Sequence, residues 1–213
     1  MRKTATYLTN VLNLYAFVIT YKNQKEFEML ITITGKPCSG KSSAAKLIVE
    51  QHGFQRIGVG DMFKEEAKRR GMNAEEFNQL CMSDPSYDYI IDNMTAEKGK
   101  ELDGQDYIFD SRLAWHFVPR SFKVFVDLDE DTMADRLVNS DREGKEKYDN
   151  IEEAKRSLRH RQELENDRYK KIYGVDIYDL SNYDFVVDSA NITQQGVADA
   201  IWDAYQKFLE ENE

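Results

Sequence analysis

The segment at residues 35–42 reads GKPCSGKS and fits the phosphate-binding pattern G-x-x-x-x-G-K-[ST]. Glycine at Gly35 and Gly40 lets the backbone turn with a positive φ and approach a phosphate closely. The amide groups of such a loop form a nest for an anion, and the N-terminus of the next helix adds positive potential. Lys41 supplies a cation for the β- and γ-phosphates, and the Ser42 hydroxyl can bind Mg²⁺. These residues predict the binding of a nucleoside triphosphate.

The residues on either side of this loop predict the secondary structure that it requires. The run MLITIT at residues 29–34 is apolar and rich in β-branched side chains, which is typical of a buried parallel strand. Residues 43–50 follow the loop and carry Ala44, Leu47 and Ile48 at helical spacing. The order of strand, glycine loop and helix favours a true phosphate loop over a chance match.

The composition indicates one α/β domain with a substantial core, because the chain has 213 residues. Charged residues make up 32% of the chain and the net charge is −10, which disfavours partners such as nucleic acid or anionic membranes. The two cysteines, Cys38 and Cys81, lack C-x-x-C spacing and indicate the reducing cytoplasm. We interpret Cys38 as a small residue that fills a position in the loop. The three histidines are scattered and form no metal-ligand spacing: His52, His116 and His160.

Further apolar runs predict the remaining strands of a sheet, at residues 54–59, 107–110, 122–128 and 185–188. Helical segments separate these runs, and a last helix is predicted from about 193 to 210. We therefore expect an α/β fold with a five-stranded parallel sheet and helices on both faces. Asp110 ends the third strand and should lie beside the phosphate loop, because ligands of such sheets bind at the carboxyl ends of the strands.

Two helical segments lie outside this predicted core. The first spans about 60–102, and its polar character indicates a movable flap that binds the acceptor of the reaction. Its first helix is predicted to begin at Gly60-Asp61, with Asp61 as the N-cap. The second segment spans about 140–173 and contains a predicted helix over 151–173.

Arginines are concentrated in this second segment. Arg161, Glu165 and Arg168 fall on one face of the predicted helix, which fits either a functional site or a solvated helix with salt bridges. The surface interpretation is preferred for two other arginines: Arg156 and Arg159.

Residues 1–28 precede the first core strand. The apolar patch at 11–19 is too short to span a membrane, and no A-x-A-like cleavage site follows it. We interpret these residues as an N-terminal extension that packs on the domain or adds an edge strand. A chain that begins at Met29 is expected to fold and to be active, because every motif follows that residue.

Several stretches together resemble the nucleoside monophosphate kinases: residues 35–42, VGDMFKE at 59–65 and DSRLAW at 110–115. The stretch RYKKIYGVDI at 168–177, followed by DLSNYD at 179–184, resembles the archaeal-type cytidylate kinases more specifically. The resemblance covers residues 29–213. It implies a three-layer P-loop kinase fold, with the flap at about 60–102 and a lid at about 140–173.

The resemblance also implies roles for individual residues. The phosphates of ATP would be held by Gly35, Lys36, Pro37, Cys38, Ser39, Gly40, Lys41, Ser42 and Ser43. Arg112 would bind the phosphate of the acceptor, and Asp61 and Lys64 would lie in the acceptor site. The catalytic cations would be Lys41 and three arginines that close over the transferred phosphoryl group: Arg136, Arg142 and Arg161.

Three positions depart from the pattern of this family. Lys64 stands where relatives usually have arginine, and lysine keeps the charge but loses the bidentate fork. Asp110-Ser111-Arg112 stands where relatives often have Glu-Gly-Arg, so Asp110 keeps a carboxylate for a water-mediated contact with Mg²⁺ on a shorter arm. Met133 occupies a position that is often another arginine.

Together these features predict an ATP-dependent kinase that converts CMP and dCMP into the diphosphates, with ATP and Mg²⁺ as cofactors. We expect a cytoplasmic monomer. Two alternatives stay open: a kinase for another nucleoside monophosphate such as AMP or UMP, or a non-catalytic ATP-binding P-loop protein. A GTPase is disfavoured, because the chain contains no Asn-Lys-x-Asp motif.

Overall fold

The structure is a computed structural model, and it describes residues 29–73, 76, 77, 80, 86–139, 148 and 150–212, with the backbone alone at 86–88. The predictions for the extension at 1–28, for Cys81 and for Arg142 lie outside these residues. Within the described part of the chain, no helix has the length and apolar character needed to cross a membrane.

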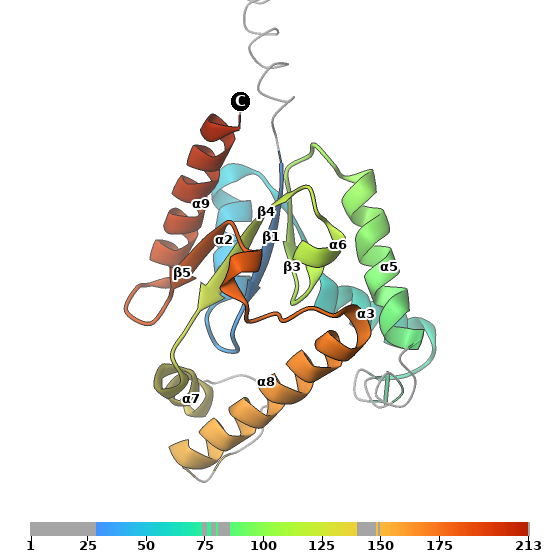
Figure 1. Ribbon diagram of the computed structural model, residues 1–213, viewed down its shortest axis with the longest axis vertical. Helices are drawn as coiled ribbons and strands as arrows, with labels where there is room; N and C mark the ends of the chain where they lie inside the picture. The colour runs from blue at the N-terminus through green and yellow to red at the C-terminus, as the bar shows by residue number, and fades with distance from the viewer. Residues whose placement is uncertain are drawn as a thin grey trace, which may run out of the picture.

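A five-stranded parallel sheet forms the centre of the fold, as predicted (Figure 1). Its strands are β1 (Leu30–Gly35), β2 (Gln55–Gly58), β3 (Tyr107–Asp110), β4 (Ser121–Asp127) and β5 (Phe185–Asp188). Their order across the sheet is β2-β3-β1-β4-β5, and all neighbouring pairs are parallel. In β1, Ile33 pairs with Asp110 on one side and with Val124 on the other. This register brings Asp110 to the end of β1, where the phosphate loop begins.

Helices cover both faces of this sheet and its carboxyl edge. Their bounds are α2 (Lys41–His52), α3 (Val59–Arg69), α5 (Ser86–Glu101), α6 (Ala114–Phe117), α7 (Glu130–Val138), α8 (Ile151–Tyr173), the 3₁₀ helix η1 (Leu180–Asn182) and α9 (Gln194–Glu211).

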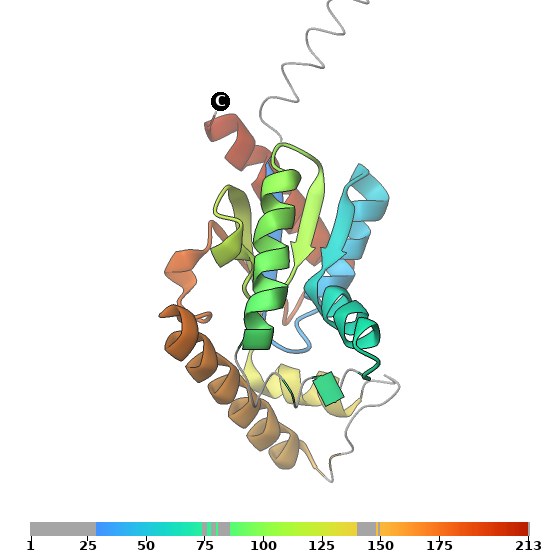
Figure 2. The same ribbon diagram turned by 90° about the vertical axis from the view of Figure 1, so that its right-hand side faces the viewer.

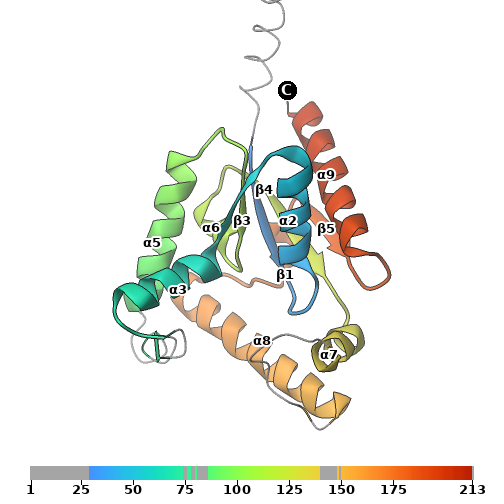
Figure 3. The same ribbon diagram turned by 180° about the vertical axis from the view of Figure 1, so that it is seen from behind.

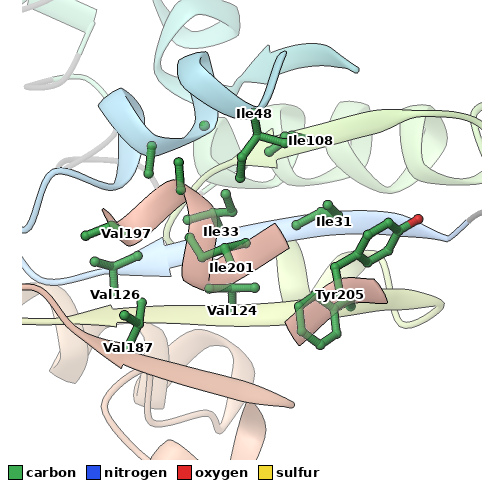
Figure 4. Packing of buried hydrophobic residues seen from close by; sticks show 14 of the residues in the cluster. Ile31, Ile33, Ile48, Ile108, Val124, Val126, Val187, Val197, Ile201 and Tyr205 are labelled. Carbon is green, nitrogen blue, oxygen red and sulfur yellow. The ribbon is translucent and has the colours of Figure 1, made fainter. Parts of the chain in front are cut away.

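One face of the sheet packs against α2 and α9, which lie side by side in Figure 3. Alternate residues of β1, Ile31 and Ile33, point to this face and contact Ile48 of α2 and Ile201 of α9 in one buried cluster (Figure 4). The hydroxyl of Tyr205 closes the cluster by donating to the carbonyl oxygen of Met29 at 2.9 Å. The first residue of the described core is thus anchored to the last helix.

The opposite face is covered by α5, α6 and the chain around η1 (Figure 2). Leu30 and Phe109 point to this face and pack against Leu102, which directly follows α5. Phe125 of β4 packs against Tyr183, which directly follows η1. Every residue of β1 is buried, which explains why this central strand is apolar apart from two threonines.

Helices α7 and α8 lie beyond the carboxyl ends of the strands and pack against each other (Figures 1 and 3). The Asn150 side chain caps α8 by accepting a 2.9 Å bond from the amide of Glu153, and Gly174 ends it with a φ of 69°. These caps confirm the predicted helix over 151–173. Because α8 crosses the carboxyl edge of the sheet, its side chains can reach the phosphate loop.

The start of α3 differs from the prediction. The helix begins at Val59 with Gly58 as its N-cap, so Asp61 lies within the first turn and is not the cap. The carboxylate of Asp61 instead accepts a 2.7 Å bond from Nη2 of Arg56 on β2. Asp61 therefore forms an ion pair with Arg56 of β2 and does not make the expected capping bond to the backbone of α3.

Candidate active site

The phosphate loop connects β1 to α2, and its backbone differs from the prediction at one glycine. Gly40 has a φ of 84°, which fits the conformational freedom of glycine. The other positive φ in the loop belongs to Cys38, at 59°, and Gly35 has none. A Cβ at Gly35 would lie 2.5 Å from the carbonyl oxygen of Val126. Gly35 is thus required by the close approach of β1 to β4, and the predicted positive φ there was wrong.

Contacts with β4 and its following loop fix the position of the phosphate loop. The amide of Lys36 donates to the carbonyl oxygen of Val126 at 3.1 Å. Its side-chain Nζ forms a 2.7 Å ion pair with Asp127 and donates to the carbonyl oxygen of Leu128 at 3.0 Å. Lys36 therefore anchors the loop to the sheet. Inside the loop, the buried hydroxyl of Ser39 has no hydrogen-bond partner among the described residues.

Lys41 contacts a nearly buried carboxylate at the end of β3. Its Nζ forms an ion pair with Oδ1 of Asp110, whose exposed fraction is 6%. Nη1 of Arg56 contacts the second carboxylate oxygen of Asp110 at 2.8 Å. Burial alone would raise the pKa of Asp110, but Lys41, the Ser42 hydroxyl and Arg56 together hold that pKa below its usual value. Asp110 therefore stays ionised and holds both cations at the carboxyl edge of the sheet.

A cavity of about 260 Å³ lies over the phosphate loop, between α2 and α8. Its floor is formed by residues 36–43, and α8 contributes Ser157, Leu158 and Arg161 to its wall. All the predicted ATP-phosphate residues except Gly35 line this cavity. Its dimensions and donors fit the phosphates of a nucleotide, and we call it the donor cavity.

A second cavity, of about 280 Å³, adjoins the ends of β3 and α2. Helix α3 contributes Val59, Gly60 and Phe63 to its wall, and α5 and α8 complete it. We call it the acceptor cavity, and its full lining is Lys41, Val59, Gly60, Phe63, Ile91, Asp92, Asp110, Ser111, Arg112, Leu113, Arg168 and Tyr169. Lys41 and Arg112 line both cavities. The two sites are thus joined at a point where two cations meet.

Arg112 reaches this junction because the turn after β3 is fixed to β1. The Thr34 hydroxyl donates to the carbonyl oxygens of Ser111 and Arg112 at 3.1 and 3.3 Å. The Arg112 guanidinium then forms a 2.8 Å ion pair with Glu165 of α8. Arg112, which the resemblance predicted to bind the acceptor phosphate, therefore contacts α8.

The chain is similar to known proteins along most of its length. A protein-family model described as an AAA domain matches residues 31–157. A cytidylate kinase from Methanocella arvoryzae is 36% identical over 180 residues, which cover 84% of this chain and 98% of that relative. A cytidylate kinase from Archaeoglobus fulgidus is 32% identical over 179 residues, covering 84% of this chain and 95% of the relative. The chain belongs to the cytidylate kinase family.

Solved structures show the same fold at lower identity. An uncharacterized protein from Eubacterium ventriosum has a TM-score of 0.61 at 18% identity and covers 83% of this chain and 97% of its own. A shikimate kinase from Bacteroides thetaiotaomicron has a TM-score of 0.57 at 14% identity and covers 85% of this chain and 98% of its own. These similarities confirm the three-layer P-loop kinase fold that was predicted for this member of the cytidylate kinase family.

Some residues that the resemblance assigned to the site lie apart from the two cavities. The Lys64 side chain is 69% exposed, and its Nζ lies 3.8 Å from Asp61. Arg136 donates to the carbonyl oxygen of Cys38 at 3.2 Å and to that of Ser189 at 2.6 Å, so it ties the phosphate loop to the end of β5. Met133, where the resemblance led to the expectation of an arginine, is buried between α7 and α8. A catalytic role for Arg136 and an acceptor role for Lys64 and Asp61 stay predictions.

Arg56 is a site residue that the sequence did not reveal. It was assigned only to a strand, yet it pairs with both Asp110 and Asp61. The available signal was a charged side chain two positions before Gly58 in a short predicted strand. Only the register of β2 against β3, which sets Arg56 opposite Ile108 and Gly58 opposite Asp110, shows that the guanidinium reaches the site.

Proposed function

We propose that this chain transfers the γ-phosphoryl group of ATP to CMP or dCMP, giving ADP and CDP or dCDP. The observation that carries this proposal is the pair of cavities that share Lys41 and Arg112. One cavity has a phosphate loop as its floor, and the other begins at the end of the adjacent strand. Membership of the cytidylate kinase family supports CMP as the acceptor.

Phosphoryl transfer mainly requires alignment and charge stabilisation. An oxygen of the acceptor phosphate attacks the γ-phosphorus, and the bond from that phosphorus to the β–γ bridging oxygen breaks. The electron pair of this bond stays on ADP. No general base is needed, because the acceptor phosphate is already anionic. Lys41 and Arg112 lie where the two phosphates would meet, so they would stabilise the charge on the transferred group.

The residues near Lys41 fit Mg²⁺, which prefers oxygen ligands and keeps several waters when bound beside phosphates. Ser42 and Asp110 supply a hydroxyl and a carboxylate, and each lies within hydrogen-bonding distance of Nζ of Lys41. When bound, Mg²⁺ would neutralise negative charge on the phosphates. Ser42 would hold the ion directly, and Asp110 would orient a water molecule of its shell.

Two helical segments, the flap and the lid, would bind and enclose the substrates. The flap at about 60–102 would bind the acceptor, since α3 and α5 line the acceptor cavity. The lid at about 140–173 would close over the donor, since α8 lines the donor cavity. Residues of a single chain line both cavities, so a monomer would be sufficient for the reaction. Both nucleotide substrates would be available in the cytoplasm. We therefore propose a cytoplasmic monomer with residues 29–213 as its single catalytic domain.

Turnover with a panel of monophosphates tests this function. ADP release is measured by a coupled assay with ATP, Mg²⁺ and CMP, dCMP, UMP or AMP as the acceptor. We expect the highest kcat/KM with CMP or dCMP, and loss of turnover with all acceptors in Lys41→Ala. A preference for AMP or UMP would replace the acceptor in the proposal. ATP binding without turnover on any of them would favour a non-catalytic P-loop protein.

A further inference from the structure

Asp110 is contacted by two cations, and only one of them faces the cavities. Lys41 pairs with Oδ1 of Asp110, and Nη1 of Arg56 lies 2.8 Å from Oδ2. Lys41 lines both the donor and the acceptor cavity, whereas Arg56 lines neither of them. A nucleotide that binds in the cavities can therefore draw Lys41 away from Asp110 without contacting Arg56.

The position of the Arg56 guanidinium is fixed by two further residues. Nη2 of Arg56 lies 2.7 Å from Oδ2 of Asp61, in the first turn of α3, so the guanidinium fork bridges two carboxylates. Gly58 pairs with Asp110 in the sheet, and a Cβ at Gly58 would lie 2.8 Å from Nη1 of Arg56. The guanidinium thus occupies space that is open because residue 58 is glycine.

Lys41 is required in two places. It pairs with Asp110 in the structure, whereas the lysine of a phosphate loop contacts the β- and γ-phosphates of a bound nucleotide. Moving to the phosphates would take one cation away from Asp110, whose exposed fraction is 6%. A nearly buried carboxylate left without any cation is strongly unfavourable. Arg56 prevents this, because it remains on the second carboxylate oxygen.

We propose that Arg56 keeps Asp110 paired when Lys41 moves to the phosphates, and so strengthens ATP binding from outside the donor cavity. This inference rests on ATP as the donor in the proposed function. Arg56 is a positioning residue, since it acts through Asp110 and touches no nucleotide. Its second contact, with Asp61, holds the guanidinium in place and joins the donor site to the first turn of α3.

The dissociation constant of ATP tests this role, measured by equilibrium binding in EDTA so that neither Mg²⁺ nor turnover contributes. We expect Arg56→Gln to raise the Kd about 10- to 100-fold, the effect of one hydrogen bond to a charged group. Arg56→Lys keeps a cation for Asp110 and should restore most of the affinity. Gly58→Ala keeps the charge of Arg56 but displaces its guanidinium, so it should also raise the Kd, by a smaller factor.

Removing the carboxylate separates this role from a general attraction between a cation and a phosphate. In an Asp110→Asn background no buried charge is left unpaired when Lys41 moves. Adding Arg56→Gln to that background should therefore change the Kd by less than about twofold, because the two substitutions act on one contact. Arg120→Gln is the control for net charge, since this arginine is 80% exposed and pairs with Asp103. It should leave the Kd unchanged.

If Arg56→Gln raises the Kd by the same factor with and without the Asp110 carboxylate, Arg56 attracts ATP directly and the inference is wrong. An unchanged Kd in a folded Arg56→Gln protein would overturn it as well. Should that variant not fold, an unchanged Kd in Gly58→Ala would do so in its place. ATP binding that follows the expected pattern without phosphoryl transfer to CMP would instead refute the proposed function and leave the role of Arg56 intact.

Discussion

Nη1 of Arg112 and Oε2 of Glu165 lie 2.8 Å apart and join the turn after β3 to the middle of α8. Only 22% of the Arg112 side chain and 21% of the Glu165 side chain are exposed, so the pair is shielded from much of the solvent. Arg112 also lines both cavities. Glu165 therefore holds the guanidinium at the junction, and an acceptor phosphate would compete with Glu165 for it.

Replacing Arg112 should affect the acceptor more than the donor. Arg112→Ala removes a charge-assisted phosphate contact, which costs about 1.5–3 kcal/mol and should raise the KM for CMP about 10- to 100-fold. Binding of ATP should weaken much less, because residues 36–43 remain to hold its phosphates. The KM for CMP and the Kd for ATP, measured on the same preparation, check this.

Glu165→Gln is the matched control for this prediction. It removes the ion pair but leaves the guanidinium in place, so CMP binding should persist or improve. If Glu165→Gln reproduces the loss seen in Arg112→Ala, the ion pair matters for structure and Arg112 does not bind the acceptor phosphate. A larger effect of Arg112→Ala on ATP than on CMP would also contradict the assignment.

Lys41 can be tested for a role in catalysis without loss of the fold. In Lys41→Ala, Asp110 keeps the ion pair with Arg56 at 2.8 Å, so the nearly buried carboxylate still has a cation. The melting temperature should therefore change little. Turnover should fall by at least about 10²-fold, the typical loss when one group that stabilises transition-state charge is removed. Near-normal turnover in a folded Lys41→Ala protein would refute the phosphate-loop assignment.

The parts of the site that the sequence predicted correctly are those that can be recognised from residues close together in the chain. The loop at 35–42, the strand that ends at Asp110 and the helix at 151–173 depend on neighbours in the chain, and all three are present. The errors concern contacts that the residue pattern does not show. Gly35 is required by a carbonyl group of β4, which depends on the register of β1 against β4. Asp61 pairs with Arg56 and does not cap α3, which depends on how the chain turns from β2 into α3.

The same reason explains the two arginines whose surroundings were not predicted. Arg56 reaches Asp110 only because β2 pairs with β3, and Arg136 reaches the carbonyl oxygen of Cys38 only because α7 packs beside the phosphate loop. By contrast, Arg159 forms an ion pair with Glu130 at 2.7 Å, which confirms the surface interpretation of that residue. Helical spacing could place Arg159 on a face, but tertiary contacts decide which partner it has.

Glu66 should make the stability of the flap depend on acidic pH. This carboxylate is 5% exposed on α3 and accepts 2.7 Å bonds from Arg69 and Arg70. The bonds from Arg69 outweigh the opposing effect of burial, and with Arg70 they lower the pKa of Glu66 from 4.5 to about 2. A lowered pKa stabilises the fold fully above pH 4.5, and this contribution is lost as the pH falls toward 2.

The difference in unfolding free energy between the wild type and Glu66→Gln should therefore be largest above pH 4.5 and should shrink as the pH falls. Denaturant unfolding over a pH series measures this difference. Glu65→Gln, at an exposed neighbouring position on α3, is the control and should give a smaller difference throughout. A difference that grows on acidification would mean that the ion pairs of Glu66 do not form in solution.

The last prediction concerns one face of α8, which spans both cavities. Arg161 lines the donor cavity, Arg168 lines the acceptor cavity, and Glu165 between them pairs with Arg112. Bound nucleotides would bring negative charge to this face and draw α8 inward, which would exclude water and favour transfer over hydrolysis. Arg161→Ala should therefore lower kcat more than it weakens ATP binding, because its contact forms fully in the closed complex. Arg159→Ala, on the same helix but paired with Glu130, should leave kcat unchanged.

Hydrogen exchange measures the closure itself. Amides of α8 and α3 should exchange more slowly when ATP and CMP analogues are bound together than with either alone, since each nucleotide fills one cavity and the face of α8 contacts both. In Arg161→Ala this added protection should be reduced in α8, while α3 keeps the protection that the CMP analogue gives alone. If kcat and exchange in α8 are both unchanged in Arg161→Ala, Arg161 is a surface residue. The closing of cations over the phosphates would then be assigned to the other two predicted lid arginines, Arg136 and Arg142.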